Sequence, residues 1–271
     1  MEQLDGRVAV ITGGGSGIGE ALAHACAAEG MRVLVADIEA GEAERVAAAL
    51  RAAGRESLAA RVDVTERESV DALADAAYAA FGAVHLLCNN AGVLTRSPIV
   101  DTPVADFEWN FAVNFYGVLH GVQAFAPRMM RQGGEAHIVN TASIGGLVPP
   151  AVHPSGAYTA SKYAVMGLSE TLRRELAPAG IGVSVLCPMG VQSRIFSSAR
   201  NRAARFGGPD ARDTDSNPAA ERKDPAEVAR RVIEGVRRGQ FYIVTHTETR
   251  ELVERRFGEI LEACARLDGS S

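Results

Sequence analysis

The chain has 271 residues, of which 47% are hydrophobic and 23% are charged, and its formal net charge at pH 7 is −5. This length and apolar content are enough for a substantial core in one α/β domain, without a division into two. The small acidic excess gives no overall attraction to nucleic acid or to an anionic membrane surface.

Residues 1–11 lack the basic flank, apolar segment and cleavage site of a signal peptide, and no apolar stretch reaches transmembrane length. We therefore expect a cytoplasmic protein without a membrane anchor. The cysteines are widely separated and form no CxxC pair, which indicates buried thiols rather than a disulfide framework or a metal site. They are Cys26, Cys88, Cys187 and Cys264.

The first predicted elements are a buried strand, Arg7–Ile11, a glycine-rich turn, Thr12–Gly19, and a helix, Glu20–Glu29. Glycines let a backbone approach a pyrophosphate, and the free N–H groups and macrodipole at a helix start favour its negative charge. The glycine spacing is a variant of the dinucleotide-binding fingerprint rather than the commoner G-x-G-x-x-G form. A tight turn without a ligand is the alternative. The spaced glycines are Gly13, Gly17 and Gly19.

A second predicted strand, Arg32–Ala36, ends at Asp37, where the fingerprint places an acid that holds the adenosine ribose hydroxyls. This carboxylate would repel the 2′-phosphate of NADP, and neither Ser16 nor Ile38 supplies a compensating cation. The sequence therefore favours NAD over NADP. Asp37 can also cap the helix that starts near Ala40, and the two roles are compatible.

Strands and helices alternate along the rest of the chain. The further predicted strands are Ser57–Val62, His85–Cys88, His137–Asn140, Gly182–Leu186 and Phe241–Val244. The main predicted helices are Gly41–Ala53, Glu66–Phe81, Phe107–Gln132 and Ala157–Ala177. This alternation predicts a Rossmann-like, doubly wound parallel sheet of about seven strands with helices on both faces, and ligands at the carboxyl ends of the strands.

Tyr158 and Lys162 stand four residues apart on a predicted helix and therefore share a face, and Ser143 follows an upstream apolar run. An ammonium about 4 Å from a phenol favours the phenolate by roughly 4 kcal/mol at an effective dielectric of about 20. Part of that attraction would move a tyrosine pKa from about 10 toward neutrality, where acid–base catalysis is most effective. On its own, such a pair is usually a solvated helix face.

Taken together, these motifs resemble those of the short-chain dehydrogenase/reductase family in its NAD(P)-dependent form. They occur in the family's order and reach from the first turn to Ser193. The residues that carry the resemblance are Thr12–Gly19, Asp37, Asp63 and Val64, Asn89–Gly92, Asn114, Ser143, Tyr158 with Lys162, and the Pro188 segment.

The resemblance implies catalytic roles for four residues. Tyr158 is the expected acid and base, Lys162 lowers its pKa and holds the nicotinamide ribose, and Ser143 bonds the substrate oxygen. Asn114 is expected to distort its helix and to hold a water that links the lysine to solvent. The implied activity is reversible hydride transfer between NAD(H) and a secondary alcohol or ketone.

The resemblance also implies a set of coenzyme contacts. Asp63 and Val64 are expected at the adenine, and the segment after Pro188 at the nicotinamide carboxamide. There Met189 replaces the family's glycine and can project a flexible apolar side chain toward the substrate. The full expected set is Thr12, Gly13, Gly15, Ser16, Gly17, Ile18, Gly19, Asp37, Ile38, Asp63, Val64, Asn90, Ala91, Gly92, Tyr158, Lys162, Pro188, Gly190, Val191 and Ser193.

Residues 194–222 form the least regular stretch and are expected to be a substrate lid. Its arginines either attract an anionic substrate or belong to a solvated, charge-balanced segment, and we favour the second interpretation. They are Arg194, Arg200, Arg202 and Arg205. His153 can approach the pocket or be an exposed loop residue. The reacting pocket is expected to be largely apolar, with Leu94, Ile144, Leu147, Val148, Met189, Ile195 and Phe196.

Residues 245–271 are expected to form a helical extension with one apolar stripe that needs a partner, which can be its own domain, another subunit or the lid. The stripe is Leu252, Val253, Phe257, Ile260, Leu261 and Cys264. By resemblance, we expect a homotetramer built through the helices that contain Asn114 and Tyr158, with a dimer as the alternative.

Two other functions fit the same motifs. One is an NADPH-dependent carbonyl or acyl-thioester reductase, and the other is a dinucleotide-sensing regulator without turnover. All four expected catalytic residues are present, and this argues against the sensor because a sensor has no need of a tuned acid and base.

Overall fold

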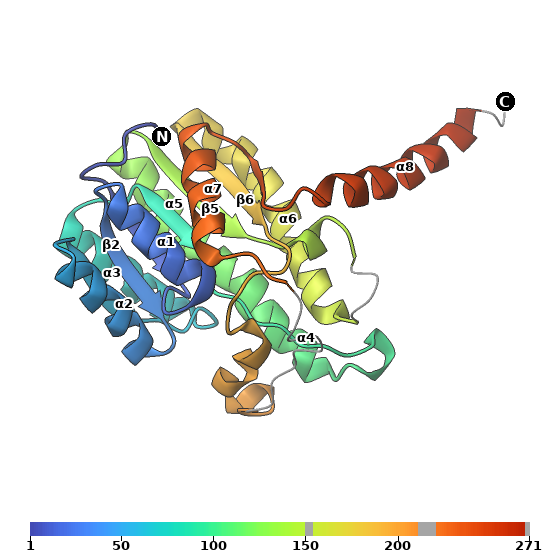
Figure 1. Ribbon diagram of the computed structural model, residues 1–271, viewed down its shortest axis with the longest axis horizontal. Helices are drawn as coiled ribbons and strands as arrows, with labels where there is room; N and C mark the ends of the chain where they lie inside the picture. The colour runs from blue at the N-terminus through green and yellow to red at the C-terminus, as the bar shows by residue number, and fades with distance from the viewer. Residues whose placement is uncertain (150–153, 211–220, 269–271) are drawn as a thin grey trace.

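The computed structural model describes residues 1–149, 154–210 and 221–268. Its centre is a parallel seven-stranded sheet in the order β3-β2-β1-β4-β5-β6-β7 (Figure 1). The strands are β1 (Val8–Thr12), β2 (Arg32–Asp37), β3 (Ser57–Arg61), β4 (Leu86–Asn89), β5 (Ala136–Thr141), β6 (Ile181–Cys187) and β7 (Tyr242–Val244). The predicted fold class is confirmed, and no strand end differs from its predicted position by more than one residue.

Two apolar layers hold helices against the two faces of this sheet. Successive side chains of a strand point to opposite faces, so Val8 and Val10 belong to one buried cluster while Ala9 and Ile11 belong to the other. One face carries α1 (Gly17–Ala28), α2 (Ala40–Ala52) and α7 (Pro225–Arg237). The other carries α3 (Arg67–Phe81), α5 (Gly117–Gln132) and α6 (Gly156–Leu176).

The predicted helical stretch Phe107–Gln132 is present, but it begins earlier, at Val104, and is not α-helical throughout. The structure has α4 (Val104–Phe111), a π-helical segment η2 (Ala112–Tyr116) and then α5. Such π segments are uncommon and are frequent at functional sites. This one contains Asn114, so the helix distortion expected at that residue is present.

Helix α7 was not among the predicted helices, although its start has a recognisable signal. Asp224 precedes Pro225, and its carboxylate accepts a hydrogen bond of 2.8 Å from the backbone N–H of Ala226. Proline at the first helical position and an acidic N-cap are typical of a helix start.

The expected lid contains two short helical segments, η5 (Ile195–Asn201) and η6 (Ala204–Phe206), and residues 211–220 of it lie outside the described residues. Three further 3-10 turns are η1 (Ile99–Asp101), η3 (Ile144–Gly146) and η4 (Ala177–Ala179).

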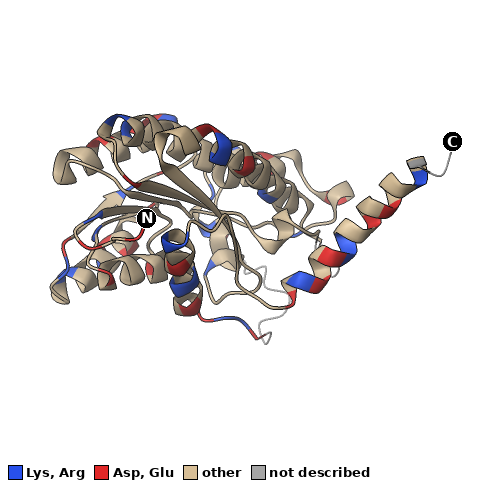
Figure 2. Ribbon diagram, turned by 90° about the horizontal axis from the view of Figure 1, so that it is seen from above, with Lys and Arg blue, Asp and Glu red and all other residues tan. Residues whose placement is uncertain are grey.

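The last helix, α8 (Thr249–Asp268), extends away from the body of the molecule (Figure 1). Basic and acidic residues alternate along it (Figure 2), while Ile260 and Leu261 of the apolar stripe are 43% and 68% exposed. The apolar stripe of α8 is therefore exposed to solvent in the outer turns of the helix. Among the described residues, no helix combines the length and the apolar character that crossing a bilayer requires.

Candidate active site

The glycine turn between β1 and α1 is shaped by close backbone approaches. Gly13 and Gly17 have positive φ angles of 64° and 53°, a conformation that favours glycine. A Cβ at Gly19 would lie 2.0 Å from the carbonyl oxygen of Gly13. Helix α1 begins at Gly17 without a side-chain cap from its N-cap residue, Ser16. The N–H groups of its first turn are thus available to an anion.

Asp37 lies at the end of β2 with its carboxylate almost fully buried. One oxygen accepts a hydrogen bond of 2.9 Å from the backbone N–H of Gly15, and the other accepts one of 3.0 Å from that of Glu39. The carboxylate therefore links the glycine turn to the start of α2. Both roles considered for this residue, at the groove and beside a helix start, are compatible with this position.

The turn after β4 joins the glycine turn through its backbone and through Asn90. The hydroxyl of Thr12 accepts hydrogen bonds from the N–H groups of Asn90 and Ala91, at 3.0 and 3.2 Å. The Asn90 amide donates to the carbonyl oxygen of Thr12 at 3.1 Å. A Cβ at Gly92 would lie 3.6 Å from the Nζ atom of Lys162, so this turn also lies close to that expected catalytic residue.

Asn114 is fully buried, and its side-chain amide forms hydrogen bonds with both backbone polar groups of Val93. The Oδ1 atom accepts from the Val93 N–H at 2.8 Å, and the Nδ2 atom donates to the Val93 carbonyl at 3.0 Å. The same Nδ2 donates to the hydroxyl of Ser161 at 3.0 Å. Asn114 thereby fixes the loop after β4 against α6, next to the lysine.

Tyr158 and Lys162 occupy the first two turns of α6, where Lys162 is buried and Tyr158 is partly buried. The Nζ atom of Lys162 donates a hydrogen bond of 2.8 Å to the carbonyl oxygen of Thr141, at the end of β5. It lies 5.6 Å from the centroid of the Tyr158 ring. Ser143 is two residues beyond β5, and its hydroxyl accepts a hydrogen bond of 3.1 Å from the backbone N–H of Gly145.

Burial dominates the electrostatics of this pair. It lowers the pKa of Lys162 to about 7 and raises the pKa of Tyr158, which hydrogen bonding from Ser143 partly offsets. The lowering of the Tyr158 pKa by Lys162 stays a prediction from the resemblance. Buried Cys187 lies close enough to Lys162 for each to influence the pKa of the other.

The segment after β6 keeps an ordinary backbone despite the methionine. Among the described residues only glycines have positive φ, so Met189 introduces no such strain. Its side chain lines the cavity, and its sulfur accepts a hydrogen bond from the hydroxyl of Thr249, at the start of α8. The first turn of α8 is therefore tied to the pocket wall.

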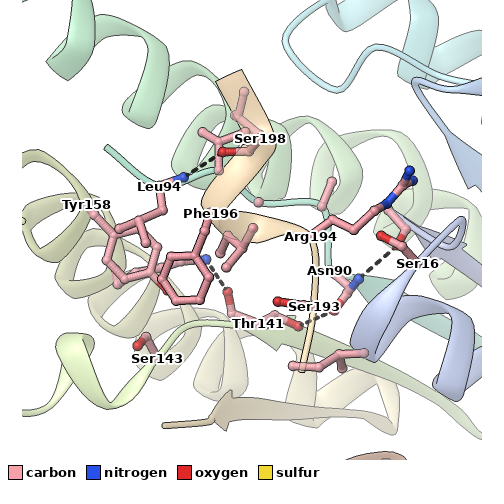
Figure 3. Close-up of a pocket in the computed structure, with 18 of the residues that line it drawn as sticks. Ser16, Asn90, Leu94, Thr141, Ser143, Tyr158, Ser193, Arg194, Phe196 and Ser198 are labelled. Carbon is pink, nitrogen blue, oxygen red and sulfur yellow. Dashed lines mark hydrogen bonds between the residues drawn. The ribbon is translucent and has the colours of Figure 1, made fainter. Parts of the chain in front are cut away.

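These elements surround a cavity of about 480 Å³ that is lined at one end by Asp37 and at the other by Tyr158. Figure 3 shows the part of it between Ser16 and Tyr158. Of the expected coenzyme residues, the cavity is lined by Gly13, Ser16, Ile18, Asp37, Ile38, Asp63, Val64, Asn90, Ala91, Gly92, Tyr158, Lys162, Pro188, Gly190, Val191 and Ser193. The others lie in the glycine turn without lining it, and they are Thr12, Gly15, Gly17 and Gly19.

The apolar pocket residues are placed as expected, with two exceptions. Leu94, Ile144, Met189, Ile195 and Phe196 line the cavity. Leu147 and Val148 do not line it, and Leu147 packs instead against the core beside α6. His153 lies outside the described residues.

Trp109 also lines the cavity, as do Arg96 and Arg222, whose guanidinium groups lie 4.7 and 4.5 Å from the centroid of the Phe196 ring. The sequence analysis did not identify these three residues. Arg96 and Arg222 are charged residues in separate loops, and no motif marks either of them.

The lid arginines form ion pairs with the body of the protein. Arg194 and Arg200 bind Glu39 at 2.9 and 2.6 Å, Arg202 binds Asp106 at 2.6 Å, and Arg205 binds Glu66. The interpretation of these arginines as charge-balanced residues agrees with these pairs. Their partners lie outside the lid, however, so the charges attach it to the rest of the molecule.

Comparison with known proteins identifies the group to which this chain is related. Residues 7–204 match the family model described as short chain dehydrogenase. The chain belongs to the short-chain dehydrogenase family. The crystal structure of a short-chain dehydrogenase/reductase from Burkholderia phymatum in complex with NAD is similar to this short-chain dehydrogenase, with 41% identity, 97% coverage of each chain and a TM-score of 0.90.

Two relatives carry the names of specific dehydrogenases. C alpha-dehydrogenase from Sphingobium sp. (strain NBRC 103272 / SYK-6) is 34% identical over 99% of this chain and 90% of its own length. D-threitol dehydrogenase from Mycolicibacterium smegmatis is 38% identical over 73% of this chain and 75% of its own length. This short-chain dehydrogenase thus belongs to a family of oxidoreductases.

Proposed function

We propose that the protein transfers a hydride reversibly between NAD(H) and a secondary alcohol or ketone, with Tyr158 as general acid and base. The observation that carries the proposal is the convergence of Tyr158, Lys162 and Ser143 on a cavity that continues to Asp37. The dehydrogenase names of the relatives support alcohol oxidation. The substrate is expected to be largely apolar, because aliphatic and aromatic side chains line that end of the cavity.

Residues along the cavity fit NAD. The uncapped first turn of α1 suits a pyrophosphate, since its N–H groups are free to donate. Asp37 suits the ribose hydroxyls, and Val64 offers an apolar wall for the adenine. When bound, NAD supplies the hydride acceptor and a positive charge that favours the Tyr158 phenolate.

The protein's own residues handle the proton. In oxidation, the Tyr158 phenolate accepts the proton of the substrate hydroxyl, and in reduction the phenol returns a proton to the carbonyl oxygen. Ser143 donates a hydrogen bond to that oxygen and stabilises its developing charge. Lys162 lies between Tyr158 and the Asn114 region, and a water held beside Asn114 would connect the lysine to solvent.

The test is Tyr158→Phe, with Tyr163→Phe as the matched control. Both tyrosines lie in α6, but the Tyr163 hydroxyl donates to the carbonyl of Leu147. Tyr158→Phe should bind NADH normally and lose turnover by about a thousandfold or more, whereas Tyr163→Phe should keep it. A Tyr158→Phe enzyme with normal turnover would remove the assigned acid and base.

We propose NAD rather than NADP because the Asp37 carboxylate would face the 2′-phosphate as a like charge. If NADPH binds more tightly than NADH, the runner-up becomes the better assignment, an NADPH-dependent carbonyl or acyl-thioester reductase. A dinucleotide sensor would bind NADH but give no turnover with any member of a broad alcohol and carbonyl panel.

We also propose that residues 1–271 form one functional unit, with residues 194–222 as the lid and residues 245–271 as an extension, assembled as a homotetramer or a dimer. The uncovered stripe of α8 supports an assembly, because a large apolar surface is stabilised by a partner. The buried free thiols of Cys26, Cys88 and Cys187 suit a reducing compartment such as the cytoplasm, while Cys264 is exposed.

A further inference from the structure

A group of charged residues surrounds the glycine turn, at the end of the cavity away from Tyr158. Arg45 binds Glu20 at 2.8 Å and Glu42 at 2.9 Å, and it donates to the carbonyl oxygen of Gly15 at 3.0 Å. Arg194 approaches this group from the lid, with its Nη1 atom 4.0 Å from Glu42. The end of the groove that holds Asp37 thus contains cations that come from elsewhere in the chain.

Arg194 reaches this place because the lid begins directly on the glycine turn. A Cβ at Gly17 would lie 2.8 Å from the Cβ of Ser193, so the residue before Arg194 packs on the start of α1. The side chain of Arg194 then runs toward the turn that contains Ser16 (Figure 3), and it lines the same cavity. Its guanidinium is therefore near the N–H groups that suit a pyrophosphate.

Two features of Arg194 indicate a donor that is oriented for a ligand. Its Nη2 atom is fixed by the bond to Glu39. Its Nε atom is buried and has no hydrogen-bond partner among the described residues. The side chain as a whole is 38% exposed, so it is the Nε atom alone that is buried. Buried donors are normally satisfied, and a buried Nε–H without a partner at a cavity wall therefore calls for an acceptor from a bound molecule.

Glu39 fixes two lid arginines at once. Arg200 donates to it from Nη2 at 2.6 Å and also donates from Nη1 to the carbonyl oxygen of Ser197 at 2.9 Å. Glu39 itself follows β2, and its own N–H is bound to Asp37. One carboxylate therefore connects the ribose end of the groove to the lid.

We propose that Arg194, at the start of the lid, binds the pyrophosphate of the coenzyme and that Glu39 holds its guanidinium in position. This proposal rests on the coenzyme groove of the proposed function and assigns a residue that the turn and strand-end motifs do not include. A guanidinium that donates to a phosphate oxygen forms a charge-assisted bond, which is stronger than a neutral one.

The test measures binding of NADH and NADPH by fluorescence titration, without turnover. Arg194→Gln should weaken both coenzymes about tenfold at low salt, and the difference from the parent protein should shrink as salt rises. Arg194→Lys keeps the positive charge but not the forked guanidinium, so it should weaken coenzyme binding less than Arg194→Gln does. The control is Arg51→Gln, because Arg51 pairs with Glu44 on α2 and does not line the cavity.

Glu39→Gln tests the second part of the proposal. It should release NADH about fivefold faster in stopped-flow measurements, and adding it to Arg194→Gln should have little further effect on NADH affinity. The melting temperature of each variant, compared with that of Arg51→Gln, separates these effects from unfolding.

Three outcomes would overturn the proposal. They are unchanged NADH affinity in Arg194→Gln, a loss confined to NADPH, which would place the guanidinium at the 2′-phosphate, and fully additive effects of the two substitutions. Each leaves the role of Tyr158 intact, whereas normal turnover of Tyr158→Phe would leave the Arg194 assignment intact.

Discussion

The Nζ atom of Lys162 lies 5.6 Å from the centre of the Tyr158 ring and is bonded to the carbonyl oxygen of Thr141 rather than to the phenol. The pair shares a helix face, as its spacing predicts, yet burial rather than mutual attraction is the largest cause of the pKa shift of each residue. Desolvation favours the neutral phenol and the neutral amine. In the proposed oxidation, Tyr158 would therefore have to lose its proton before it could act as the base.

The first prediction concerns the pH dependence of oxidation. Because burial raises the pKa of Tyr158 above its ordinary value of 10.0 while the charge of bound NAD acts against that rise, kcat/KM for alcohol oxidation at saturating NAD should still rise with pH above pH 7. Hydrogen bonding from Ser143 lowers this pKa, so Ser143→Ala should slow the reaction and move the rising limb to higher pH. Rate profiles of the two proteins between about pH 6 and pH 10.5 provide the measurement. A plateau below pH 7 in the parent enzyme would contradict the prediction.

The second prediction is that Lys162→Met stabilises the protein while abolishing catalysis. The pKa of Lys162 is about 7 when folded against 10.5 for the model group, so the unfolded chain binds more protons between these values. The free energy of unfolding should therefore rise with pH across this window. Lys162→Met removes that dependence and should gain on the order of 4 kcal/mol at pH 7, from about 1.4 kcal/mol per pKa unit. Urea denaturation at several pH values measures it, and an equal slope in both proteins would contradict it.

The sequence predicts the sheet well because its strands are short apolar runs between helix-forming segments. The same local reasoning makes Tyr158, Lys162, Ser143 and Asp37 candidates, since each follows a strand or occupies a fixed helix spacing, while the roles expected of the first three come from the family resemblance. The π segment at Asn114 has no such signal in amphipathic periodicity, because one inserted residue barely alters the pattern over a helix as long as Phe107–Gln132. Its distortion was expected only from the family resemblance.

Hydrophobic periodicity does not predict contacts between segments that are far apart in the sequence. Arg194 and Glu39 are separated by 155 positions, and each is an ordinary charged residue in its own segment. The motifs allow a cation for the 2′-phosphate only at Ser16 or Ile38, and they do not indicate that Arg194 lines the same cavity from the lid. The sequence offered one signal for Arg194, because it directly follows Ser193, which already belonged to the expected coenzyme contacts.

A third prediction follows from the three bonds of the Asn114 amide. Asn114→Ala leaves the N–H and the carbonyl of Val93 without their partner in a buried site, which should destabilise the protein by about 2 to 4 kcal/mol. Ser161→Ala removes only one of the bonds and should cost about 1 kcal/mol. Chemical denaturation of the two variants gives the comparison. Equal losses would mean that the Val93 contacts contribute little.

The fourth prediction concerns coenzyme preference at Asp37. Asp37→Asn removes the charge but keeps the shape, and should reduce the preference for NADH over NADPH by about a hundredfold through lost repulsion. The Asp37 carboxylate also accepts from Gly15 and Glu39, so some loss of NADH affinity should accompany this change. Titration with both coenzymes measures the ratio. Glu44→Gln, on the outer side of α2, is the control, and an unchanged ratio in Asp37→Asn would remove Asp37 as the discriminating residue.

The final prediction concerns α8 and the assembly. Its first turn is tied to Met189, and Arg256 packs over the ring of Tyr163 on α6, but Ile260 and Leu261 are 43% and 68% exposed. If another copy of the chain covers this stripe, the double substitution Ile260→Glu and Leu261→Glu should lower the molar mass found by light scattering. Glu262→Gln, on the polar side of the same helix, should leave the mass unchanged. Because the stripe lies outside the cavity, NADH binding should survive in both variants, and an unchanged mass in the double variant would show that α8 does not hold the assembly together.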